Sequence, residues 1–407
     1  MKAIRFNATI PRYTFALAFG RIRKEAYYKG PLAPLYMDDV PEPELPGENW
    51  VKIKTIYGGV CGSDINMIFL EDTPYTEPYI TMPYTVGHEN VGQIVEVGAK
   101  VEDFKPGDRV VADPMLPCAA REIEPPCKSC SRGDFSQCLN LREGNLPPGL
   151  NLGFCEPVGG SWSEYFVAHK SQLMKVPDEM TDEQAIMIDV FSSALHPVMR
   201  NLPSNDDTVL VYGCGIIGML VTASIKALTD ARVIVIARYP FQAEVANGFG
   251  ADEIILEREV EDLYSEVANR TGAQVLKPMI GDRYLNGGPD IVFDCVGKRD
   301  TINDALRMTT SGGKIVIIGL VTVPEKIDWT PIWFKELTIR GTLCSSTETY
   351  NGKTQKTYEW ARDLITEGKV KVDHLLTHIW RLDQYIEMIE TATKKGNTGC
   401  IKQAFKF

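Results

Sequence analysis

The sequence predicts an α/β protein that combines a doubly wound parallel sheet with a second, mainly β domain. Beyond about residue 205, apolar strands alternate with helical stretches, and the strands are expected at 208–212, 232–237, 291–294 and 314–319. In the first half, alternating strands are separated by Gly and Pro, and three are expected at 50–56, 90–97 and 109–112. A length of 407 residues also favours two domains.

Two further stretches of the first half have distinct patterns. Residues 181–200 have a helical pattern, with a break expected near Pro197. Residues 113–160 are rich in Pro, Gly and Cys and have little periodicity. A long ordered loop of this kind usually has a reason such as a bound metal.

A glycine turn follows the apolar strand at 208–212. It reads Gly213-Cys214-Gly215-Ile216-Ile217-Gly218 and opens an apolar helix. In such a turn the first glycine makes the bend, the second lets the backbone approach a pyrophosphate, and the third lets helix pack on strand. The helix N-terminus then faces the phosphates. The predicted dinucleotide contacts are Gly213, Gly215, Ile216, Ile217 and Gly218.

The end of the next strand bears on which nicotinamide cofactor is used. An acid there would bind the ribose 2′-hydroxyl, but no acid lies near Ala237, and Arg238 follows directly. A missing carboxylate beside a guanidinium suits a 2′-phosphate, so we expect NADP rather than NAD.

Composition excludes several classes of partner. The formal charge is 43 − 54 = −11, which argues against nucleic acid and anionic membranes. The apolar window 208–228 holds three glycines and Lys226, so a buried strand, turn and helix explains it better than a membrane span. Five of the ten cysteines lie between residues 118 and 155, which favours metal ligation before disulfides. With no secretory signal at the N-terminus, we expect a cytoplasmic protein.

A thiol and an imidazole, each near an acid, form the most informative pair. Cys61 stands in Gly-Val-Cys-Gly-Ser-Asp, and His88 stands in Gly-His-Glu, 27 positions later. Sulfur plus imidazole is a zinc-type ligand set. Because zinc polarises an oxygen and a dinucleotide accepts a hydride, the two motifs together indicate alcohol oxidation or carbonyl reduction.

These motifs occur in one order over nearly the whole chain, together with a cysteine-rich segment and Gly312-Gly313-Lys314-Ile315-Val316. In this the chain resembles the medium-chain zinc-dependent alcohol dehydrogenases. The resemblance implies a GroES-like catalytic domain at about 1–190 and 345–407, and a Rossmann domain at about 191–344. It also implies a homodimer or homotetramer. Compared with the family, the segments 10–38 and 273–289 are additional.

The resemblance implies roles around a catalytic zinc. Cys61, His88 and Asp189 match its ligands, and Glu89 matches a fourth or exchanging ligand. Asp64 matches an acid that orients His88. Ser63 matches a hydroxyl that takes the alcohol proton into a relay. Many relatives carry a relay histidine five residues after the cysteine, whereas this chain has Asn66, so the later route of the proton stays open.

The resemblance also implies a structural zinc. Cys127, Cys130 and Cys138 match three of its ligands, while Glu124 stands where a fourth thiolate is usual. We expect Cys118 to supply the fourth sulfur, because closed structural sites favour four thiolates. Glu124 as the ligand and an empty site are the alternatives.

Three more positions match cofactor contacts of the family. Val296 and Leu320 lie in turns that run along the nicotinamide through backbone atoms, and Lys402 matches a basic residue that reaches the pyrophosphate.

The sequence therefore predicts a zinc-dependent oxidoreductase that transfers a hydride between NAD(P) and a small or medium alcohol, polyol or sugar, or its carbonyl. Two alternatives stay open. One is a dismutase-like or aldehyde-oxidising relative that retains its cofactor, and the other is a non-catalytic dinucleotide-binding protein.

Overall fold

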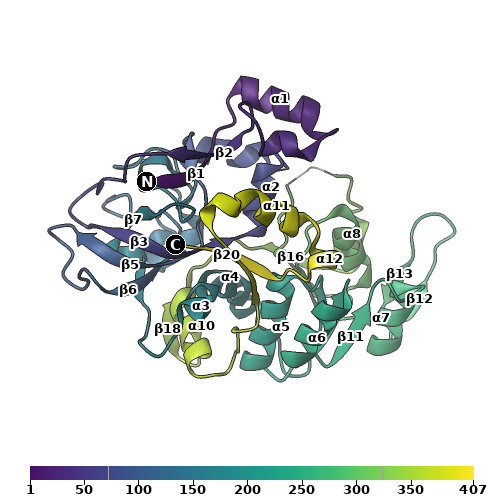
Figure 1. The fold of residues 1–407 in the computed structure, drawn as a ribbon. Helices are drawn as coiled ribbons and strands as arrows, with labels where there is room; N and C mark the ends of the chain where they lie inside the picture. The colour runs from purple at the N-terminus through teal and green to yellow at the C-terminus, as the bar shows by residue number, and fades with distance from the viewer. Residues whose placement is uncertain (72, 323–324) are drawn as a thin grey trace. The chain divides into compact units, whose positions relative to one another are not determined.

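The computed structural model describes residues 1–71, 73–322 and 325–407, and the chain folds into two compact units (Figure 1). Unit 1 comprises Met1–Val190, Ser345–Thr347 and Val372–Phe407, and unit 2 comprises Phe191–Cys344 and Glu348–Lys371.

Unit 1 is built around a seven-stranded sheet. Its order is β19-β20-β3-β5-β6-β8, and β7 pairs with β3 off this path. The strands are β3 (Trp50–Val60), β5 (Asn90–Val97), β6 (Arg109–Ala112), β7 (Tyr165–His169), β8 (Leu173–Lys175), β19 (Leu376–Trp380) and β20 (Lys402–Lys406). Neighbours along the order from β20 to β8 are antiparallel. Their inward faces bury Trp50, Ile53, Ile94 and Phe166, which belong to one apolar core.

The remaining elements of unit 1 are short. A three-stranded sheet has the order β2 (Leu35–Asp39), β1 (Lys2–Phe6), β4 (Tyr84–Thr85). The α-helices are α1 (Ile10–Gly20), α2 (Gly62–Ile68), α3 (Asp182–Ala185), α11 (Tyr385–Thr393) and α12 (Lys395–Thr398). The 3₁₀ helices are η1 (Lys24–Tyr27), η2 (Pro74–Tyr79), η3 (Cys130–Arg132), η4 (Phe135–Gln137), η5 (Glu156–Val158), η6 (Lys170–Gln172) and η7 (Leu382–Gln384).

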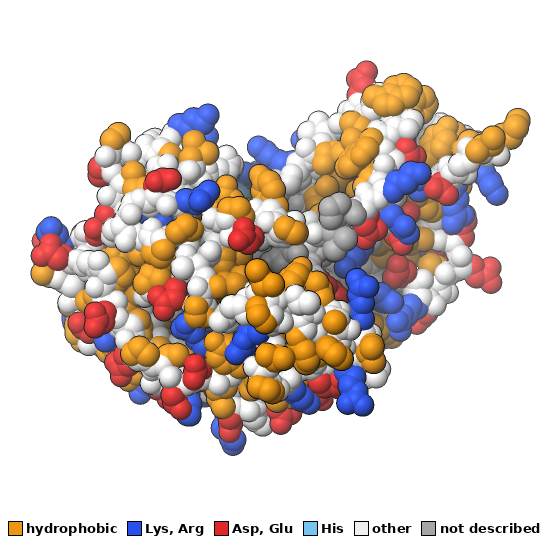
Figure 2. All heavy atoms as spheres, turned by 90° about the horizontal axis from the view of Figure 1, so that it is seen from above, with side chains coloured by type: hydrophobic (Ala, Val, Ile, Leu, Met, Phe, Trp, Pro, Cys, Tyr) orange, Lys and Arg blue, Asp and Glu red, His pale blue; other side chains and the backbone are white. Residues whose placement is uncertain are grey.

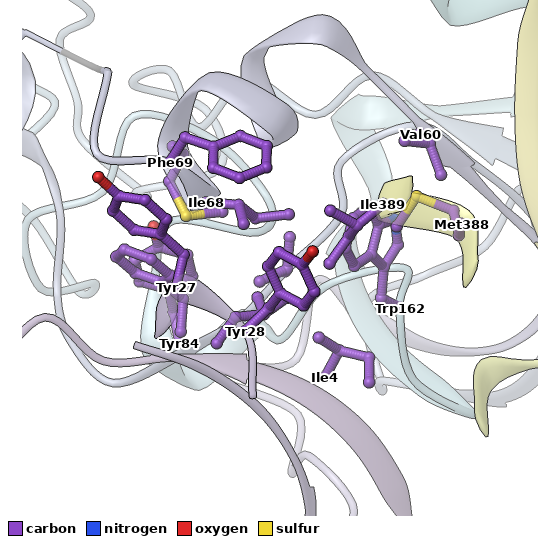
Figure 3. Close-up of a cluster of buried hydrophobic side chains, with 14 of the residues drawn as sticks. Ile4, Tyr27, Tyr28, Val60, Ile68, Phe69, Tyr84, Trp162, Met388 and Ile389 are labelled. Atoms are coloured by element: carbon purple, nitrogen blue, oxygen red, sulfur yellow. The ribbon is translucent and has the colours of Figure 1, made fainter. Parts of the chain in front are cut away.

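The additional segment 10–38 forms α1, η1 and β2. It is tied to α2 by an aromatic cluster, in which the rings of Tyr27 and Tyr28 meet the edge of Phe69 at centroid distances of 5.4 and 6.2 Å (Figure 3). The segment also exposes apolar side chains, since Ile10 and Ile22 are 83% and 81% exposed. Figure 2 looks down on the side where α1 lies in Figure 1, and hydrophobic side chains gather there with Lys and Arg among them.

Unit 2 contains a six-stranded parallel sheet. Its order is β11 (Glu253–Leu256), β10 (Arg232–Ala237), β9 (Thr208–Tyr212), β14 (Ile291–Asp294), β15 (Lys314–Ile317), β16 (Thr338–Gly341). The strand order reverses at β9 and β14, which defines a doubly wound sheet with its binding crevice at that point. The predicted strands of this part are confirmed, with β15 ending two residues earlier than expected.

Helices connect and cover these strands. They are α5 (Ile216–Leu228), α6 (Pro240–Gly248), α7 (Leu263–Thr271), α8 (Arg299–Met308), α9 (Thr330–Phe334) and α10 (Thr357–Thr366). Alternate residues of β9 and β10 pack against α7 and α8 in one core. The additional segment 273–289 forms a hairpin of β12 (Gln274–Leu276) and β13 (Tyr284–Asn286).

The helix expected at 181–200 is interrupted at a different place. It is divided into α3 and α4 (Met187–Arg200) at Ile186, whereas Pro197 lies inside α4. The prediction of a break at Pro197 was therefore wrong. The proline lies in the last turn of α4, where it removes only one hydrogen bond of a helix that is buried along most of its length.

The assignment of segment 348–371 differs from the expectation, which placed all of 345–407 in the catalytic domain. Strands β17 (Thr347–Tyr350) and β18 (Lys353–Lys356) lead into α10, and the segment belongs to unit 2. The buried carboxylate of Glu348 explains this, because it accepts hydrogen bonds from His196 Nδ1 at 2.7 Å and Arg200 Nε at 2.8 Å.

Candidate active site and cofactor site

Cys61, His88 and Glu89 come together because two neighbouring strands begin and end beside one another. Cys61 directly follows β3, and His88-Glu89 directly precede β5. Antiparallel pairing sets Gly58 opposite Asn90, so residues that are 27 positions apart meet at one end of the pair. The three ligand-type atoms all lie within 4.8 Å of one another.

Asp64 contacts both the cysteine and the histidine. It lies in the first turn of α2, is fully buried, and accepts the backbone N–H of Cys61 at 2.8 Å. Its other oxygen lies 3.5 Å from His88 Nδ1, which directs Nε2 away from Asp64. Burial by itself lowers the pKa of His88, but the charges of Asp64 and Cys61 outweigh burial and raise it well above its ordinary value. The surroundings of His88 therefore favour a positive charge at this position.

Lys402 balances Glu89. Strand β20 lies beside β3, and the Lys402 ammonium forms a buried ion pair with Glu89 and donates to the carbonyl of Val60 at 3.0 Å. Both side chains are 1% exposed. Glu89 Oε1 is buried and has no hydrogen-bond partner among the described residues. A thiol, an imidazole and an unsatisfied carboxylate oxygen in one place are a fitting ligand set for zinc.

This placement differs from the prediction that Lys402 reaches a pyrophosphate. Its ammonium is inside unit 1 and committed to Glu89 and a backbone carbonyl, so it is not available to a cofactor in this structure. A lysine near the C-terminus is usually exposed to solvent. The sequence does not show that this lysine is buried beside an acid.

Asp189 is placed close to the cluster but outside it. It lies in the first turn of α4 and is 7% exposed. Among the described residues, its carboxylate does not join the group of atoms within 4.8 Å. Burial by itself lowers the pKa of Lys402, whereas the negative charges of Glu89 and Cys61 raise it, and Asp189 contributes in the same direction. Ser63 and Asn66 are half-buried in α2.

The four cysteines of the long loop form a second cluster. The sulfur atoms of Cys118, Cys127, Cys130 and Cys138 all lie within 4.8 Å of one another. Glu124 is exposed and outside the group, so the structure places Cys118 where a fourth thiolate is expected.

Donated N–H groups surround these sulfur atoms. Cys118 Sγ accepts from Cys127 N and from Asn140 Nδ2, both at 3.3 Å. Burial raises the pKa of Cys127, but N–H groups, with that of Leu139 first, lower it to about 6. Burial raises the pKa of Cys130, and it raises that of Cys138 to about 11, so the N–H donors favour the thiolate at Cys127 in particular.

Arg121 organises the same loop and was missed by sequence reasoning. Its guanidinium is fully buried and makes hydrogen bonds of 2.8–3.1 Å to five backbone carbonyls, those of Leu116, Glu143, Leu146, Pro147 and Gly149. All five donors of the fork are used. The loop also contains Arg132 and Arg142, and nothing in the sequence distinguishes Arg121 from them.

The glycine turn of unit 2 has the geometry that a dinucleotide site requires. Gly213 has φ +94°, a conformation that favours glycine, and a Cβ on Gly218 would collide with the carbonyl of Gly213. Around Gly215 a Cβ would meet no atom within 4 Å, so the backbone is open to a ligand. The helix α5 begins at Ile216, with Ile217 next.

The loop after β14 lies against this turn. Val296 packs beside Gly213, and Gly297 packs against Gly319, which precedes Leu320. Asp294 holds the loop: its Oδ1 accepts the N–H groups of Val296 at 2.9 Å and Gly297 at 3.1 Å. Burial raises the pKa of this carboxyl. Val296 and Leu320 are 36% and 45% exposed.

Arg238 follows β10 directly and is exposed, as a residue that contacts a soluble cofactor must be. None of the helices in the described ranges combines the length and the hydropathy that crossing a membrane requires.

Comparison with known proteins identifies relatives of both parts of the chain. Residues 47–178 match the alcohol dehydrogenase GroES-like domain, and residues 217–366 match the zinc-binding dehydrogenase family. The chain is 30% identical to (R,R)-butanediol dehydrogenase of Bacillus subtilis over 86% of its own length and 90% of the relative. It is 27% identical to L-idonate 5-dehydrogenase of Vitis vinifera over 85% of each chain.

Solved structures have the same fold. The crystal structure of 2R,3R-butanediol dehydrogenase from Bacillus subtilis is 26% identical, with a TM-score of 0.70 over 92% of this chain and 96% of that one. A putative zinc-binding dehydrogenase from Sinorhizobium meliloti 1021, solved with NADP, has a TM-score of 0.71 over 92% and 96%, at 23% identity. The latter shows the fold alone.

Family matches over both units and the 30% identical relative agree with the fold and the motifs. The chain belongs to the zinc-dependent medium-chain alcohol dehydrogenases, and it is an oxidoreductase of alcohols and their carbonyls that uses zinc and a nicotinamide cofactor.

Proposed function

We propose that the catalytic zinc is held by Cys61, His88 and Glu89, with Asp189 as a further ligand, and that the enzyme oxidises a small or medium alcohol, polyol or sugar with NADP in preference to NAD. The observation that carries this proposal is the convergence of three ligand-type atoms within 4.8 Å around a buried carboxylate oxygen with no hydrogen-bond partner among the described residues. When bound, zinc supplies Lewis acidity toward the substrate oxygen.

The chain's own residues prepare that chemistry. Asp64 fixes the orientation of His88, and Lys402 holds one oxygen of Glu89 while leaving the other free. Ser63, two residues after Cys61, is the hydroxyl that takes the proton from the alcohol through its Oγ. Because Asn66 cannot serve as a base, the proton leaves Ser63 by another group or by water.

The relatives are named for butanediol, sorbitol, idonate and threonine, which are compounds with more than one polar group. We therefore propose vicinal diols and polyols as the first substrates to test. The purified chain is mixed with alcohols, polyols, sugars and hydroxy acids and with NAD or NADP, and the reduced nicotinamide is followed by absorbance. Turnover with a diol or polyol, faster with NADP, is the expected result. A strong preference for NAD would contradict the proposed cofactor.

The metal site has its own test. Zinc is measured in the parent and in Cys61→Ala, with Cys155→Ala as the control, because Cys155 is buried but belongs to neither metal-type cluster. Cys61→Ala should lose one zinc and the activity, whereas the control should keep both. Equal zinc in Cys61→Ala and the parent would remove the proposed site. Cofactor that stays bound after desalting would favour a dismutase-like relative instead.

We also propose a second, structural zinc at Cys118, Cys127, Cys130 and Cys138, a homodimer or homotetramer, and a cytoplasmic location. Large exposed apolar side chains support self-association. Among them are Ile10 of α1, Ile22 just after it, and Trp333 and Phe334 of α9, which are 71% and 60% exposed. Light scattering on the purified chain measures the assembly, and a monomer at micromolar concentration would contradict it.

A further inference from the structure

A second arginine lies at the edge of the sheet that carries Arg238. Strands β10 and β11 are parallel neighbours, with Ala237 opposite Leu256. Arg238 directly follows β10, and Arg258 is the second residue after β11, so both belong to the carboxyl edge of the sheet. Ligands of doubly wound sheets bind along this edge.

The position of these arginines along the edge indicates which part of a dinucleotide they face. Strand β9, which leads into the glycine turn, lies between β10 and β14. The β14 loop, with Val296, packs on one side of that turn. Arg238 and Arg258 follow the strands on its other side. A dinucleotide whose pyrophosphate rests on the glycine turn and whose nicotinamide runs toward β14 therefore extends its adenosine half toward the ends of β10 and β11.

An aromatic pair holds Arg258 in place. Its guanidinium carbon lies 4.7 Å from the centre of the Tyr239 ring, and Tyr239 stacks on Phe241 with centroids 5.7 Å apart and planes 9° apart. A guanidinium on an aromatic face is oriented while its N–H groups stay free at the edge. Because Tyr239 directly follows Arg238, the stack brings the second cation to the segment that carries the first.

The turn beneath the two arginines is also fixed. Gln242 Oε1 accepts the backbone N–H groups of Arg238 at 3.1 Å and of Tyr239 at 3.2 Å. The backbone that presents Arg238 is therefore ordered before a ligand arrives.

Neither guanidinium is neutralised. Both residues are exposed, and in the part of the chain that the structure describes neither forms a salt bridge within 4.0 Å with an acid, although Glu257 and Glu259 flank Arg258 in sequence. By contrast, Arg232 at the opposite end of β10 is paired with Glu253. Two uncompensated guanidinium groups at one sheet edge suit a dianion such as a phosphate monoester.

We propose that Arg258 is a specificity-determining residue that binds the 2′-phosphate of NADP together with Arg238, while Tyr239 orients it. The inference rests on the proposed preference for NADP. It adds Arg258, which the sequence alone does not identify as a cofactor contact. Arg258 follows a different strand and lies 20 positions after Arg238, so pairing of β10 with β11 is what joins them.

The test compares two fragments that differ only in the phosphate. Adenosine 2′,5′-bisphosphate and 5′-AMP are titrated calorimetrically into the full-length parent, Arg258→Gln, Arg238→Gln and the control Arg232→Gln, whose side chain lies at the other end of β10. We expect Arg258→Gln to weaken binding of the bisphosphate by about 10- to 100-fold, as for a lost charge-assisted hydrogen bond. The affinity for 5′-AMP should change by less than about twofold. Arg258→Lys should retain part of the preference, because it keeps the charge but not the fork.

The outcomes separate the two claims. A parent that binds both fragments equally overturns the preference for NADP and the inference with it. A parent that prefers the bisphosphate, with the preference lost in Arg238→Gln but kept in Arg258→Gln, overturns the role of Arg258 alone. Equal weakening of both fragments in Arg258→Gln also overturns it, because the residue would then act on the shared nucleoside. Thermal melting of each variant shows whether it is folded. If Arg258→Gln is unfolded, the affinity of Arg258→Lys for the two fragments tests the role of Arg258.

Discussion

The two clusters of metal-type side chains in unit 1 are built in opposite ways. Cys61, His88 and Glu89 are a mixed set at the end of two paired strands, surrounded by the buried charges of Asp64 and Lys402. The four cysteines belong to a loop with little regular structure, and backbone N–H groups and Arg121 surround them. One cluster contains an acid whose Oε1 has no hydrogen-bond partner among the described residues, and the other contains only sulfur.

The two ligand sets suit different kinds of zinc site. A mixed set of thiol, imidazole and carboxylate is typical of catalytic zinc sites, which keep one position open for substrate. A closed set of four thiolates leaves no open position and instead orders a loop that has little core of its own. The predictions below test whether the first cluster depends on charge and the second on backbone order.

The largest effect on stability is expected from Arg121→Met. The change deprives five carbonyls of a donor in a buried place, and we expect a loss of about 4 kcal/mol or more in the free energy of unfolding. Urea unfolding of the full chain measures it. Arg142→Met, an exposed arginine of the same loop, is the control and should change stability by less than about 0.5 kcal/mol. Similar losses in both variants would contradict the role of Arg121.

Lys402→Met should have the next largest effect, now at the mixed cluster. Removing the cation leaves Glu89 buried without its partner, which costs about 3 kcal/mol. Adding Glu89→Gln to Lys402→Met should recover part of that loss, and a double-mutant cycle of unfolding free energies measures the coupling. Additive losses would show that the pair is not coupled.

Cys118→Ser should remove one zinc and lower the melting temperature by at least about 5 °C, because the cysteine loop loses a ligand. Glu124→Gln is the matched control, since this exposed acid occupies the alternative ligand position. It should keep its zinc and its melting temperature. Loss of zinc in Glu124→Gln with retention in Cys118→Ser would reverse the assignment.

The smallest effect is expected from Asp64→Asn. The asparagine keeps the size of the side chain but removes the charge that faces His88, so zinc affinity or activity should fall by about 10- to 100-fold without loss of the fold. Competition with a chelator measures the affinity, and melting temperature provides the control. An unchanged affinity would mean that Asp64 acts only as the cap of α2 through the N–H of Cys61.

Features carried by neighbouring residues were predictable from the sequence. The strands of both units follow from apolar alternation and from Gly and Pro at their ends, and β5, β6, β9, β10 and β14 have the expected bounds. The glycine turn was also recognisable, because the demands on Gly213 and Gly218 arise within six residues. Local conformation and local patterning determine such features.

Tertiary structure decided the features that join distant segments. The sequence alone does not show that Lys402 pairs with Glu89, 313 positions earlier, or that Arg121 binds five carbonyls. Nor does it show that Asp189 stays outside the group of atoms within 4.8 Å, or that Arg258 lies over Tyr239. Burial of charge and contact between strands depend on which distant segments become neighbours in the fold. Composition and periodicity along the chain do not determine those neighbours.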